Sequence, residues 1–555
     1  MRGATLVIEA LKKHKIKKIF GYPGGAIMPV YDAIYDAVQE GSIDHTLCRN
    51  EQGAAFAAQG YARSTASVGV CFATSGPGAT NLVTGLADAL TDSVPIVAIT
   101  GQVGADLIGT DAFQEGDILG LSLSCTKHSY LVTDPMDLPR VLMEAFVVAQ
   151  SGRPGPVWVD IAKNVQLVDM EFPSFPEIKM PSIPSVDIPS ILNAKRLLEQ
   201  AQRPVVYLGG GVKLGKATQE FRQFIEEYQL PTVSTLTALG TVEKNTPYYL
   251  GMVGMHGNQA ANLVVQQSDL LLVVGARFDD RVTGKLDTFA PDAKIIHIDI
   301  DAAEIGKLRN VDVALKGEIK EILSRLSGIQ LSNLNAWRSL VDNEKQKYAW
   351  TYQEEGTYIS GPTLLKHLSD KLSDTAVVAT DVGQHQMWAA QHMLPTQPEN
   401  FLTSAAFGTM GFGLPSAIGA KIARPEDQVV LVSGDGSFMM NIQELGTIKR
   451  KKVPLKIVLL NNQRLGMVRQ WQNLFFQDHL SETVLDDNPD FVALAAAFGI
   501  QGKTITQPEE VEDALDEMLN AQGAYLLHVR IFENENVWPL VPPGAANQNM
   551  LEEDQ

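Results

Sequence analysis

The chain contains a series of short apolar runs rich in β-branched residues, each followed by a turn and a helical stretch. Strands that are apolar throughout and alternate with helices are typical of parallel sheets with both faces covered. We therefore predict an α/β protein that is built from doubly wound parallel sheets. The clearest of these runs are residues 68–74, 96–100, 205–208, 270–275, 294–299, 429–433 and 455–460.

Two stretches without strand character divide these runs into three groups. Residues 170–190 contain five prolines, which cannot donate to a sheet ladder, so we expect an extended linker there. Residues 327–361 are polar and helical in pattern. We predict three doubly wound domains and a Pro- and Gly-rich tail that joins no sheet, over residues 1–165, 190–325, 360–535 and 536–555.

The charge balance and the cysteines exclude several classes of protein. The net charge is −19, whereas a nucleic-acid binder needs a basic face to meet phosphates. The three cysteines, Cys48, Cys71 and Cys125, lack the spacing of a zinc site or a disulfide framework. No apolar run approaches the roughly 18 residues of a membrane helix, and the first 20 residues are typical of an amphipathic helix rather than a targeting segment. We expect a cytoplasmic protein without nucleic-acid or membrane partners.

Polar residues follow two of the apolar runs in the last third of the chain. The run 429–433 leads into Gly434-Asp435-Gly436-Ser437, and the run 455–460 leads into Asn461-Asn462. If one right-handed crossover joins adjacent strands, Asp435 and Asn462 meet at one edge of the sheet. Carboxylate and amide oxygens suit Mg²⁺, whose coordination phosphates complete, and glycines at a helix start admit a phosphate. Either segment alone is usually a turn, but together they predict a metal–diphosphate site.

This pair resembles the thiamine-diphosphate motif, in which GDG is followed one crossover later by NN. Segments along nearly the whole chain resemble the catalytic subunit of acetolactate synthase (acetohydroxyacid synthase), and within that family the bacterial isozyme II type. These segments read GYPGGAIMPVYDA, RNEQGAAFAAQGYAR, ATSGPGATNLVTGLADA, GTDAFQE, SGRPGPV, GMHG, GARFDDRVTGK, TDVGQHQMWAAQ, GTMGFGLPSAIGA and GMVRQWQ.

The resemblance implies thiamine-diphosphate-dependent decarboxylation of pyruvate and transfer of the hydroxyethyl carbanion to a second 2-keto acid. Pyruvate as acceptor gives 2-acetolactate for valine and leucine synthesis, and 2-ketobutyrate gives 2-aceto-2-hydroxybutyrate for isoleucine synthesis. The implied cofactors are thiamine diphosphate, Mg²⁺ and FAD. The implied partners are a second copy of the chain, since the family builds each active site at a homodimer interface, and a small regulatory subunit.

The resemblance also assigns the catalytic base and the cofactor-binding residues. A glutamate at a helix start, as at Glu51, usually only compensates the helix dipole. In this family it bonds the cofactor's pyrimidine ring and acts as general base through it. The metal ligands carried over are Asp435, Asn462 and the carbonyl of Arg464. The residues expected around thiamine diphosphate are Glu51, Gly383, Gln384, His385, Gly408, Met410, Gly436, Ser437, Gly466, Met467 and Val468.

The middle domain resembles the flavin domain of the same family. Taken singly, His256 reads as a satisfied loop histidine and Asp299 as a strand-end cap, and the glycines do not form a GxGxxG fingerprint. The chain departs from the family's DIDPAE segment by Ala302 in place of proline. The expected FAD contacts are Arg153, Gly209, Gly210, Gly211, Met255, His256, Gly275, Arg277, Asp299, Ile300 and Asp301.

Five residues resemble those that bind substrate in the family. An arginine fork suits a carboxylate, which favours Arg281 for the 2-keto acid. Trp471 shares a helix face with Met467. It matches the family's tryptophan that favours 2-ketobutyrate over pyruvate as the second substrate, although ordinary packing explains a lone tryptophan equally well. Phe113, Gln114 and Lys163 resemble residues that line the site from the first domain.

Two other functions remain open at this stage. A flavin-dependent pyruvate oxidase or a simple decarboxylase shares GDG, NN and Glu51, but lacks the DDRVTG and GMVRQW segments present here. A non-catalytic regulatory homologue has no reason to keep Glu51, Asp435 and Asn462 together.

Overall fold

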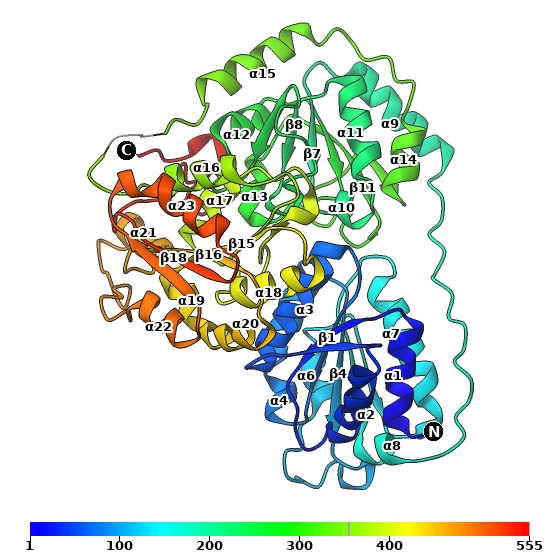
Figure 1. The fold of residues 1–555 in the computed structure, drawn as a ribbon. Helices are drawn as coiled ribbons and strands as arrows, with labels where there is room; N and C mark the ends of the chain where they lie inside the picture. The colour runs from blue at the N-terminus through cyan, green and yellow to red at the C-terminus, as the bar shows by residue number, and fades with distance from the viewer. Residues whose placement is uncertain (353–355, 554–555) are drawn as a thin grey trace.

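The computed structural model describes residues 1–352 and 356–553, and this part of the chain forms three six-stranded sheets (Figure 1). Neighbouring strands pair in parallel in all three sheets. Helices cover both faces of each sheet, as the uniformly apolar strands require. The predicted fold class, three doubly wound parallel sheets, is confirmed.

The first sheet buries alternate side chains on opposite faces. Phe72 packs beneath the helices on one face, and its neighbour Cys71 packs on the other face. The strands, in sheet order, are β2 (Asp44–Leu47), β1 (Lys18–Gly21), β3 (Gly69–Ala73), β4 (Ile96–Gln102), β6 (Val157–Ala162) and β5 (His128–Val132). The helices are α1 (Gly3–Lys13), α2 (Met28–Gln39), α3 (Glu51–Thr65), α4 (Pro77–Thr80), α5 (Val83–Thr91), α6 (Ile118–Ser122), α7 (Leu138–Gln150) and α8 (Lys163–Leu167).

The N-terminal segment differs from the prediction of one amphipathic helix. Helix α1 ends at Lys13, and Lys15 takes a left-handed conformation with φ of 60°. Residues 18–21 then form β1, which lies inside the sheet between β2 and β3. Strand pairing therefore overrides the helical pattern of this lysine-rich stretch.

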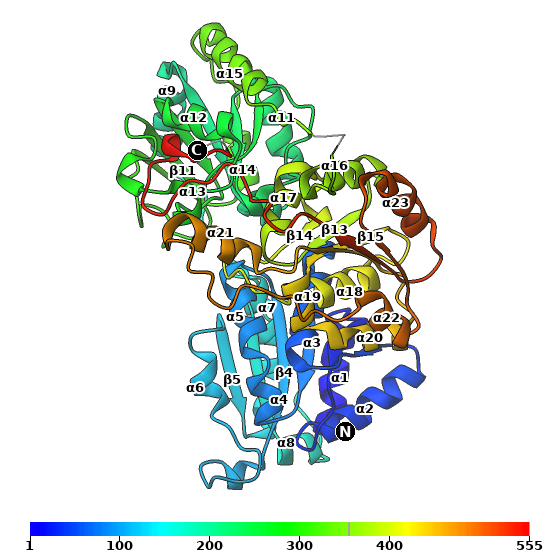
Figure 2. The ribbon, with the colours of Figure 1, turned by 90° about the vertical axis from the view of Figure 1, so that its left-hand side faces the viewer.

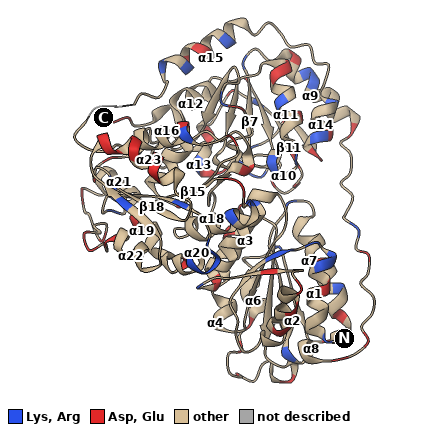
Figure 3. Cartoon of the chain, in the orientation of Figure 1, with Lys and Arg blue, Asp and Glu red and all other residues tan. Residues whose placement is uncertain are grey.

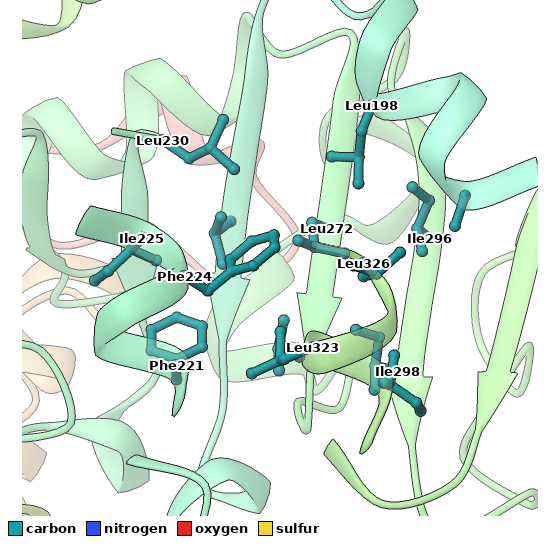
Figure 4. Close-up of a cluster of buried hydrophobic side chains, with 14 of the residues drawn as sticks. Leu198, Phe221, Phe224, Ile225, Leu230, Leu272, Ile296, Ile298, Leu323 and Leu326 are labelled. Atoms are coloured by element: carbon teal, nitrogen blue, oxygen red, sulfur yellow. The ribbon is translucent and has the colours of Figure 1, made fainter. Parts of the chain in front are cut away.

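The second sheet carries the largest apolar cluster of the central part of the chain (Figure 4), where Phe221, Phe224 and Leu323 lie over Leu272 and Ile298. Its strands, in order, are β12 (Val313–Lys316), β11 (Lys294–Asp299), β10 (Leu270–Val274), β7 (Pro204–Leu208), β8 (Thr232–Ser234) and β9 (Tyr249–Met252). Its helices are α9 (Ile188–Gln200), α10 (Gly211–Leu214), α11 (Thr218–Tyr228), α12 (Gln259–Gln266), α13 (Asp280–Thr283), α14 (Ile319–Arg325) and α15 (Asn335–Lys347).

The third sheet holds the strands that the GDG and NN segments follow. Its strands, in order, are β14 (Phe401–Leu402), β13 (Val377–Thr380), β15 (Val429–Gly434), β16 (Lys456–Asn461), β18 (Tyr525–Arg530) and β17 (Gln501–Ile505). Its helices are α16 (Gly361–Lys371), α17 (Gln384–His392), α18 (Gly413–Ala423), α19 (Asp435–Met440), α20 (Leu445–Lys451), α21 (Gly466–Phe475), α22 (Phe491–Ala497) and α23 (Val511–Asn520).

Two segments without regular structure connect these sheets. Residues 171–187 are extended and join the first sheet to the second along the edge of the molecule (Figure 1). The segment ends where the Asp187 side chain accepts a hydrogen bond from the backbone N–H of Ser190 at 2.6 Å and caps α9. The C-terminal tail returns from the third sheet across the second (Figure 2), and Val541 donates its N–H to the carbonyl of Met255 at 2.8 Å.

Acidic and basic residues occur along the chain in all three parts of the molecule (Figure 3). Within the described residues, no helix combines the length and the apolar character that crossing a bilayer demands. Within the same residues, no group of three His, Cys, Asp or Glu side chains is arranged to hold a metal ion.

Helices α3 and α18 join the first sheet to the third, and they lie side by side in Figures 1 and 2. Their backbones approach so closely that a Cβ atom on Gly60 would lie 1.9 Å from the carbonyl oxygen of Ser416. A Cβ atom on Gly419 would likewise lie 1.9 Å from the carbonyl oxygen of Ala57. Glycine is required at both positions by this contact rather than by backbone conformation.

Gly419→Ala is expected to destabilise the protein. In an exposed helix this change stabilises by about 1 kcal/mol, but here the added methyl group forces the two helices apart, at a cost of roughly 1–3 kcal/mol. Thermal unfolding followed by circular dichroism measures the effect. Gly523→Ala is the matched control, since a Cβ atom there meets nothing within 4 Å. An unchanged unfolding midpoint for Gly419→Ala would show that the helices do not pack this closely.

Candidate functional site

The GDG and NN segments meet at the carboxyl ends of two adjacent strands. Strands β15 and β16 are paired in register, with Gly434 opposite Leu460. Asp435 opens α19 directly after β15, and Asn462 follows β16 by one residue. Both residues line one cavity. The predicted convergence of the two side chains on one sheet edge is confirmed.

Three helices begin at this cavity. The first residues of α17, α19 and α21 are Gln384, Asp435 and Gly466, and all three line it. Helix N-termini carry unpaired backbone N–H groups and a partial positive charge, so they favour anions. The complete lining is Val382, Gly383, Gln384, His385, Trp388, Met410, Gly434, Asp435, Gly436, Ser437, Leu460, Asn462, Arg464, Leu465, Gly466, Met467, Val468 and Ile531.

Two of the three predicted metal ligands are held by hydrogen bonds with neighbouring side chains. Asn488 donates from Nδ2 to Oδ2 of Asp435 at 2.7 Å. Asn462 donates from Nδ2 to Oε1 of Gln384 at 3.0 Å, which fixes which side of the amide presents its oxygen. Burial raises the pKa of Asp435 to about 6, so a cation beside it would stabilise the charged form. One carboxylate and neutral oxygens form the donor set expected for Mg²⁺.

Two glycines, which have no side chains, leave room for a ligand in the cavity. A Cβ atom on Gly466 would lie 1.8 Å from Oε1 of Gln384, and one on Gly436 would lie 2.7 Å from Leu465. Side chains at these positions would therefore collide with the cavity wall and fill the space between the helix starts. The cradle fits a phosphate group held by backbone N–H groups.

His385 has an unpaired polar atom at the cavity. Its ring lies beside two glycines, because a Cβ atom on Gly383 would be 2.9 Å from Cε1 and one on Gly434 would be 2.7 Å from Nδ1. Its Nε2 atom is buried and has no hydrogen-bond partner. Burial lowers the pKa of His385 to about 3, so the ring is neutral at pH 7. A buried polar atom without a partner is costly, and a ligand oxygen would satisfy it.

The remaining wall is apolar. It includes Met410, which follows a turn at Gly408 with φ of 64°, together with Met467 and Trp388. The residues therefore fit a molecule with an anionic end near the helix starts and an apolar body beside the methionines. Ten of the residues expected around thiamine diphosphate and the three expected metal ligands lie in this part of the chain, and Gly408 alone of these is outside the cavity lining.

Glu51 lies apart from this cavity, whose lining residues all fall between 382 and 531. It opens α3, is 8% exposed, and accepts a hydrogen bond from Nδ2 of Asn81 to Oε2 at 2.9 Å. Phe113 and Gln114 lie in a loop of the same N-terminal domain and Lys163 opens α8, and Phe113 is 89% exposed. Within one chain, the two halves of the predicted active site do not form a single pocket.

Arg281 and Trp471 come together from different sheets. Arg281 lies on α13 beside the second sheet, Trp471 lies on α21 beside the third, and the guanidinium is 5.9 Å from the ring centroid. The C-terminal tail holds α13 in place, because Asn547 donates from Nδ2 to the carbonyl of Val282 at 2.9 Å. An arginine packed on an aromatic ring remains free to bind a carboxylate with its outer edge.

Most of the residues expected around FAD follow β7, β10 and β11, which are adjacent in the second sheet, whereas Met255 and His256 follow β9 at one end of that sheet. A Cβ atom on Gly209 would lie 2.2 Å from the carbonyl oxygen of Gly275, so these turns pack on each other whether or not a ligand is bound. Arg153 reaches this edge from the N-terminal sheet and pairs with Glu304 at 2.7 Å. The edge is partly exposed at Asp299, which ends β11, and at Ile300 and Asp301, which follow it.

His256 and Asp299 make the local contacts that a purely structural role predicts. Nδ1 of His256 lies 3.2 Å from the carbonyl oxygen of Pro539 in the tail, and burial lowers the pKa of His256 to about 4. Asp299 accepts the N–H of Asp301 at 2.8 Å, and burial raises the pKa of Asp299 to about 6. These contacts explain the two residues as parts of the fold and leave their role toward FAD as a prediction.

Comparison with known proteins agrees with this geometry. The N-terminal, central and C-terminal domain families of thiamine pyrophosphate enzymes match residues 1–121, 191–326 and 381–529. The chain is 59% identical to the acetolactate synthase isozyme 2 large subunit of Escherichia coli, over all of both chains. It is 45% identical to the acetolactate synthase large subunit of Pyropia yezoensis, over 99% of this chain and 95% of the relative. It is 45% identical to the isozyme 1 large subunit of Escherichia coli, over 99% and 98%.

Proposed function

We propose which residues carry out each part of the reaction in this chain, which belongs to the family of acetolactate synthase large subunits among the thiamine pyrophosphate enzymes. The chain is an acetolactate synthase of branched-chain amino acid biosynthesis, and thiamine diphosphate is its cofactor. The observation that supports the division most strongly is the cavity shared by Asp435, Asn462 and three helix starts.

In this proposal, the C-terminal sheet holds the cofactor's diphosphate through Mg²⁺. Asp435, the Asn462 amide oxygen and the Arg464 carbonyl bind the cation, and the helix starts and His385 bind the phosphate oxygens. Met410 and Met467 pack against the rings. When bound, thiamine diphosphate supplies the nucleophilic carbon and the electron sink that decarboxylation of a 2-keto acid needs. The apolar wall excludes water from the reacting carboxylate, which favours its loss as neutral CO₂.

Glu51 acts as the proton acceptor at the cofactor and is supplied by a second copy of the chain. Exposed apolar side chains support such a homodimer, because patches of this kind mark protein interfaces. They include Leu107, Phe113, Leu119, Leu121 and Leu123 in the N-terminal part, and Met440, Val468, Phe475, Phe476, Leu480 and Val484 in the C-terminal part. Pairing these surfaces would bring a Glu51 to each cavity.

Arg281 binds the carboxylate of the 2-keto acid, and Trp471 contacts its alkyl group. The acceptors are pyruvate and 2-ketobutyrate, the latter through the extra methyl group against the indole ring. Phe113, Gln114 and Lys163 line the pocket from the partner chain. The guanidinium–indole contact at 5.9 Å supports the joint role of Arg281 and Trp471.

FAD binds at the carboxyl edge of the central sheet, along Gly209–Gly211, Gly275, Arg277 and Asp299–Asp301, with Arg153 beside it. The proposed conversion of two 2-keto acids to one product and CO₂ needs no external electron donor or acceptor, so the proposed role of the flavin is structural. A small regulatory subunit is a further partner, since the relatives are named large subunits. The bacterial relatives are biosynthetic enzymes, which supports a place in the cytoplasm.

Cofactor omission with pyruvate as the only substrate tests this proposal. The complete mixture of thiamine diphosphate, Mg²⁺ and FAD is expected to give 2-acetolactate. Omission of thiamine diphosphate or Mg²⁺ is expected to abolish the product, and omission of FAD to reduce it. Release of acetaldehyde would instead indicate a decarboxylase, acetyl phosphate with oxygen uptake an oxidase, and no product in any mixture a non-catalytic homologue.

A further inference from the structure

Residues 404–411 form a loop, here termed the cavity loop, that carries Met410 into the cavity. Its C-terminal end is held by its own domain. Gly411 donates its N–H to Oδ1 of Asp381 at 2.8 Å and accepts a hydrogen bond from Nδ2 of Asn441 at 2.7 Å. Its N-terminal end is also held there, because Gln386 on α17 donates from Nε2 to the carbonyl of Ser404 at 2.9 Å. Between these two ends the loop is bound by side chains of the N-terminal domain.

Two buried acids of the N-terminal domain bind the loop backbone and hydroxyls. Asp92, just after α5, accepts the N–H groups of Ala405 at 3.0 Å and Ala406 at 2.9 Å. Asp88, on α5, accepts hydrogen bonds from the hydroxyls of Ser404 and, at 3.0 Å, Thr409. The Ser404 hydroxyl oxygen in turn accepts the N–H of Thr409 at 2.8 Å. The donors on both sides of Gly408 are thus tied to one acidic pair.

Arg63 on α3 is the counter-ion of this pair. Its Nη2 lies 3.4 Å from Oδ2 of Asp88 and 3.0 Å from Oδ2 of Asp92, whose side chains are 0% and 1% exposed. Its Nη1 donates to the carbonyl of Thr403 at 3.0 Å. One arginine cannot neutralise two buried carboxylates, so the loop's N–H and O–H donors carry the remaining stabilisation.

We propose that Asp88 and Asp92 are positioning residues that fix the cavity loop and thereby set Met410 against the bound cofactor in the same chain. This inference rests on the proposed function, because it assigns the cavity to thiamine diphosphate. It means that the N-terminal domain acts on the cofactor of its own chain through the loop, separately from the Glu51 that it supplies to a partner.

The first arm of the test needs no cofactor. Asp92→Asn replaces one acceptor oxygen with an N–H₂ group that repels the loop's N–H donors, and Ser404→Ala is a milder, uncharged variant if Asp92→Asn fails to fold. Hydrogen–deuterium exchange of residues 404–411 is expected to accelerate at least tenfold in both. Asp32→Asn, which breaks an exposed ion pair with Arg2, is the matched control and is expected to leave this segment unchanged. Unchanged exchange in the loop of both variants would overturn the anchoring.

The second arm measures thiamine diphosphate affinity in the presence of Mg²⁺ from quenching of tryptophan fluorescence, because Trp388 lines the cavity. Loss of one charge-assisted hydrogen bond is expected to weaken binding about tenfold in Asp92→Asn and Ser404→Ala. The same substitutions are then made in a Met410→Ala background. If the acids act through Met410, their effect there is expected to fall below about twofold. An equal loss of affinity in both backgrounds would show a merely structural role and overturn the proposal.

The two arms separate this inference from the proposed function. Absence of thiamine diphosphate binding by the unmodified protein, with loop exchange responding as expected, would contradict the cofactor assignment and leave the anchoring intact. Normal binding by the unmodified protein, with unaltered loop exchange or affinity in the variants, would contradict the positioning role alone.

Discussion

Glu51→Gln is expected to lower the rate of acetolactate formation by about 100-fold to 10,000-fold, the range that general base catalysis contributes. The substitution preserves shape, and the amide oxygen can still accept the hydrogen bond that Asn81 donates to Oε2 of Glu51 at 2.9 Å. What is lost is the ability to take up a proton. The measurement is kcat with saturating cofactors, together with the affinity for thiamine diphosphate.

The affinity measurement determines how a loss of activity is interpreted. Cofactor binding is expected to change by less than about tenfold, since a single hydrogen bond is altered. Glu9→Gln, on an exposed helix face where Glu9 pairs with Lys12 at 3.0 Å, is the control for a carboxylate lost elsewhere. Full activity of Glu51→Gln would refute the assignment of the base, and inactivity caused only by lost cofactor would reduce Glu51 to a binding residue.

Asp435→Asn is expected to weaken Mg²⁺-dependent binding of thiamine diphosphate by more than about 100-fold, because the only carboxylate in the proposed ligand set loses its charge. Asn488→Ala is the graded comparison. It removes the hydrogen bond to Asp435 at 2.7 Å but no ligand, and such supporting contacts contribute about 10- to 100-fold in metal affinity. Titration calorimetry with and without Mg²⁺ measures both. If Asp435→Asn and the unmodified protein bind thiamine diphosphate with the same affinity, and Mg²⁺ does not change it, a metal site here is contradicted.

Mixing the two inactive variants tests where each active site is assembled. If Glu51 serves the cavity of the partner chain, each mixed dimer of Glu51→Gln and Asp435→Asn contains one intact site and one doubly altered site. Random reassortment of equal amounts would then restore about a quarter of the unmodified activity. No recovery after exchange of subunits, verified by differently tagged chains, would place Glu51 and Asp435 of one chain in the same site.

The arrangement of Asp435 and Asn462 could be predicted because it depends only on local rules. An apolar run identifies a parallel strand, its carboxyl end identifies the sheet edge, and one crossover places neighbouring strands together. The same reasoning brings Gly209 and Asp299 to one edge of the central sheet. The helical spacing of four residues likewise predicts that Met467 and Trp471 share one helix, and both lie on α21.

The hydrogen bonds that hold these residues in place could not be predicted, because their partners come from segments remote in sequence. Asn488 lies in an irregular segment with no pattern of its own, yet its amide reaches Asp435. The contacts of Asp88 and Asp92 with the cavity loop depend on how two domains dock. The sequence also offered no sign that the tail would bind His256 or that the helical pattern before Lys18 would give way to β1.

The close contact of α3 and α18 also affects how the chain folds while it is being synthesised. Arg63 and its partner Thr403 are 340 residues apart, so at 5–20 residues per second α3 waits about 20–70 s for the surface that covers it. During that time the alanine- and glycine-rich face of α3 is open to solvent, and Asp88 and Asp92 are paired with Arg63 but lack the loop donors. The α3 face of the nascent N-terminal domain therefore stays uncovered until residues 403–419 have been made, and slow synthesis of the downstream segments prolongs its exposure.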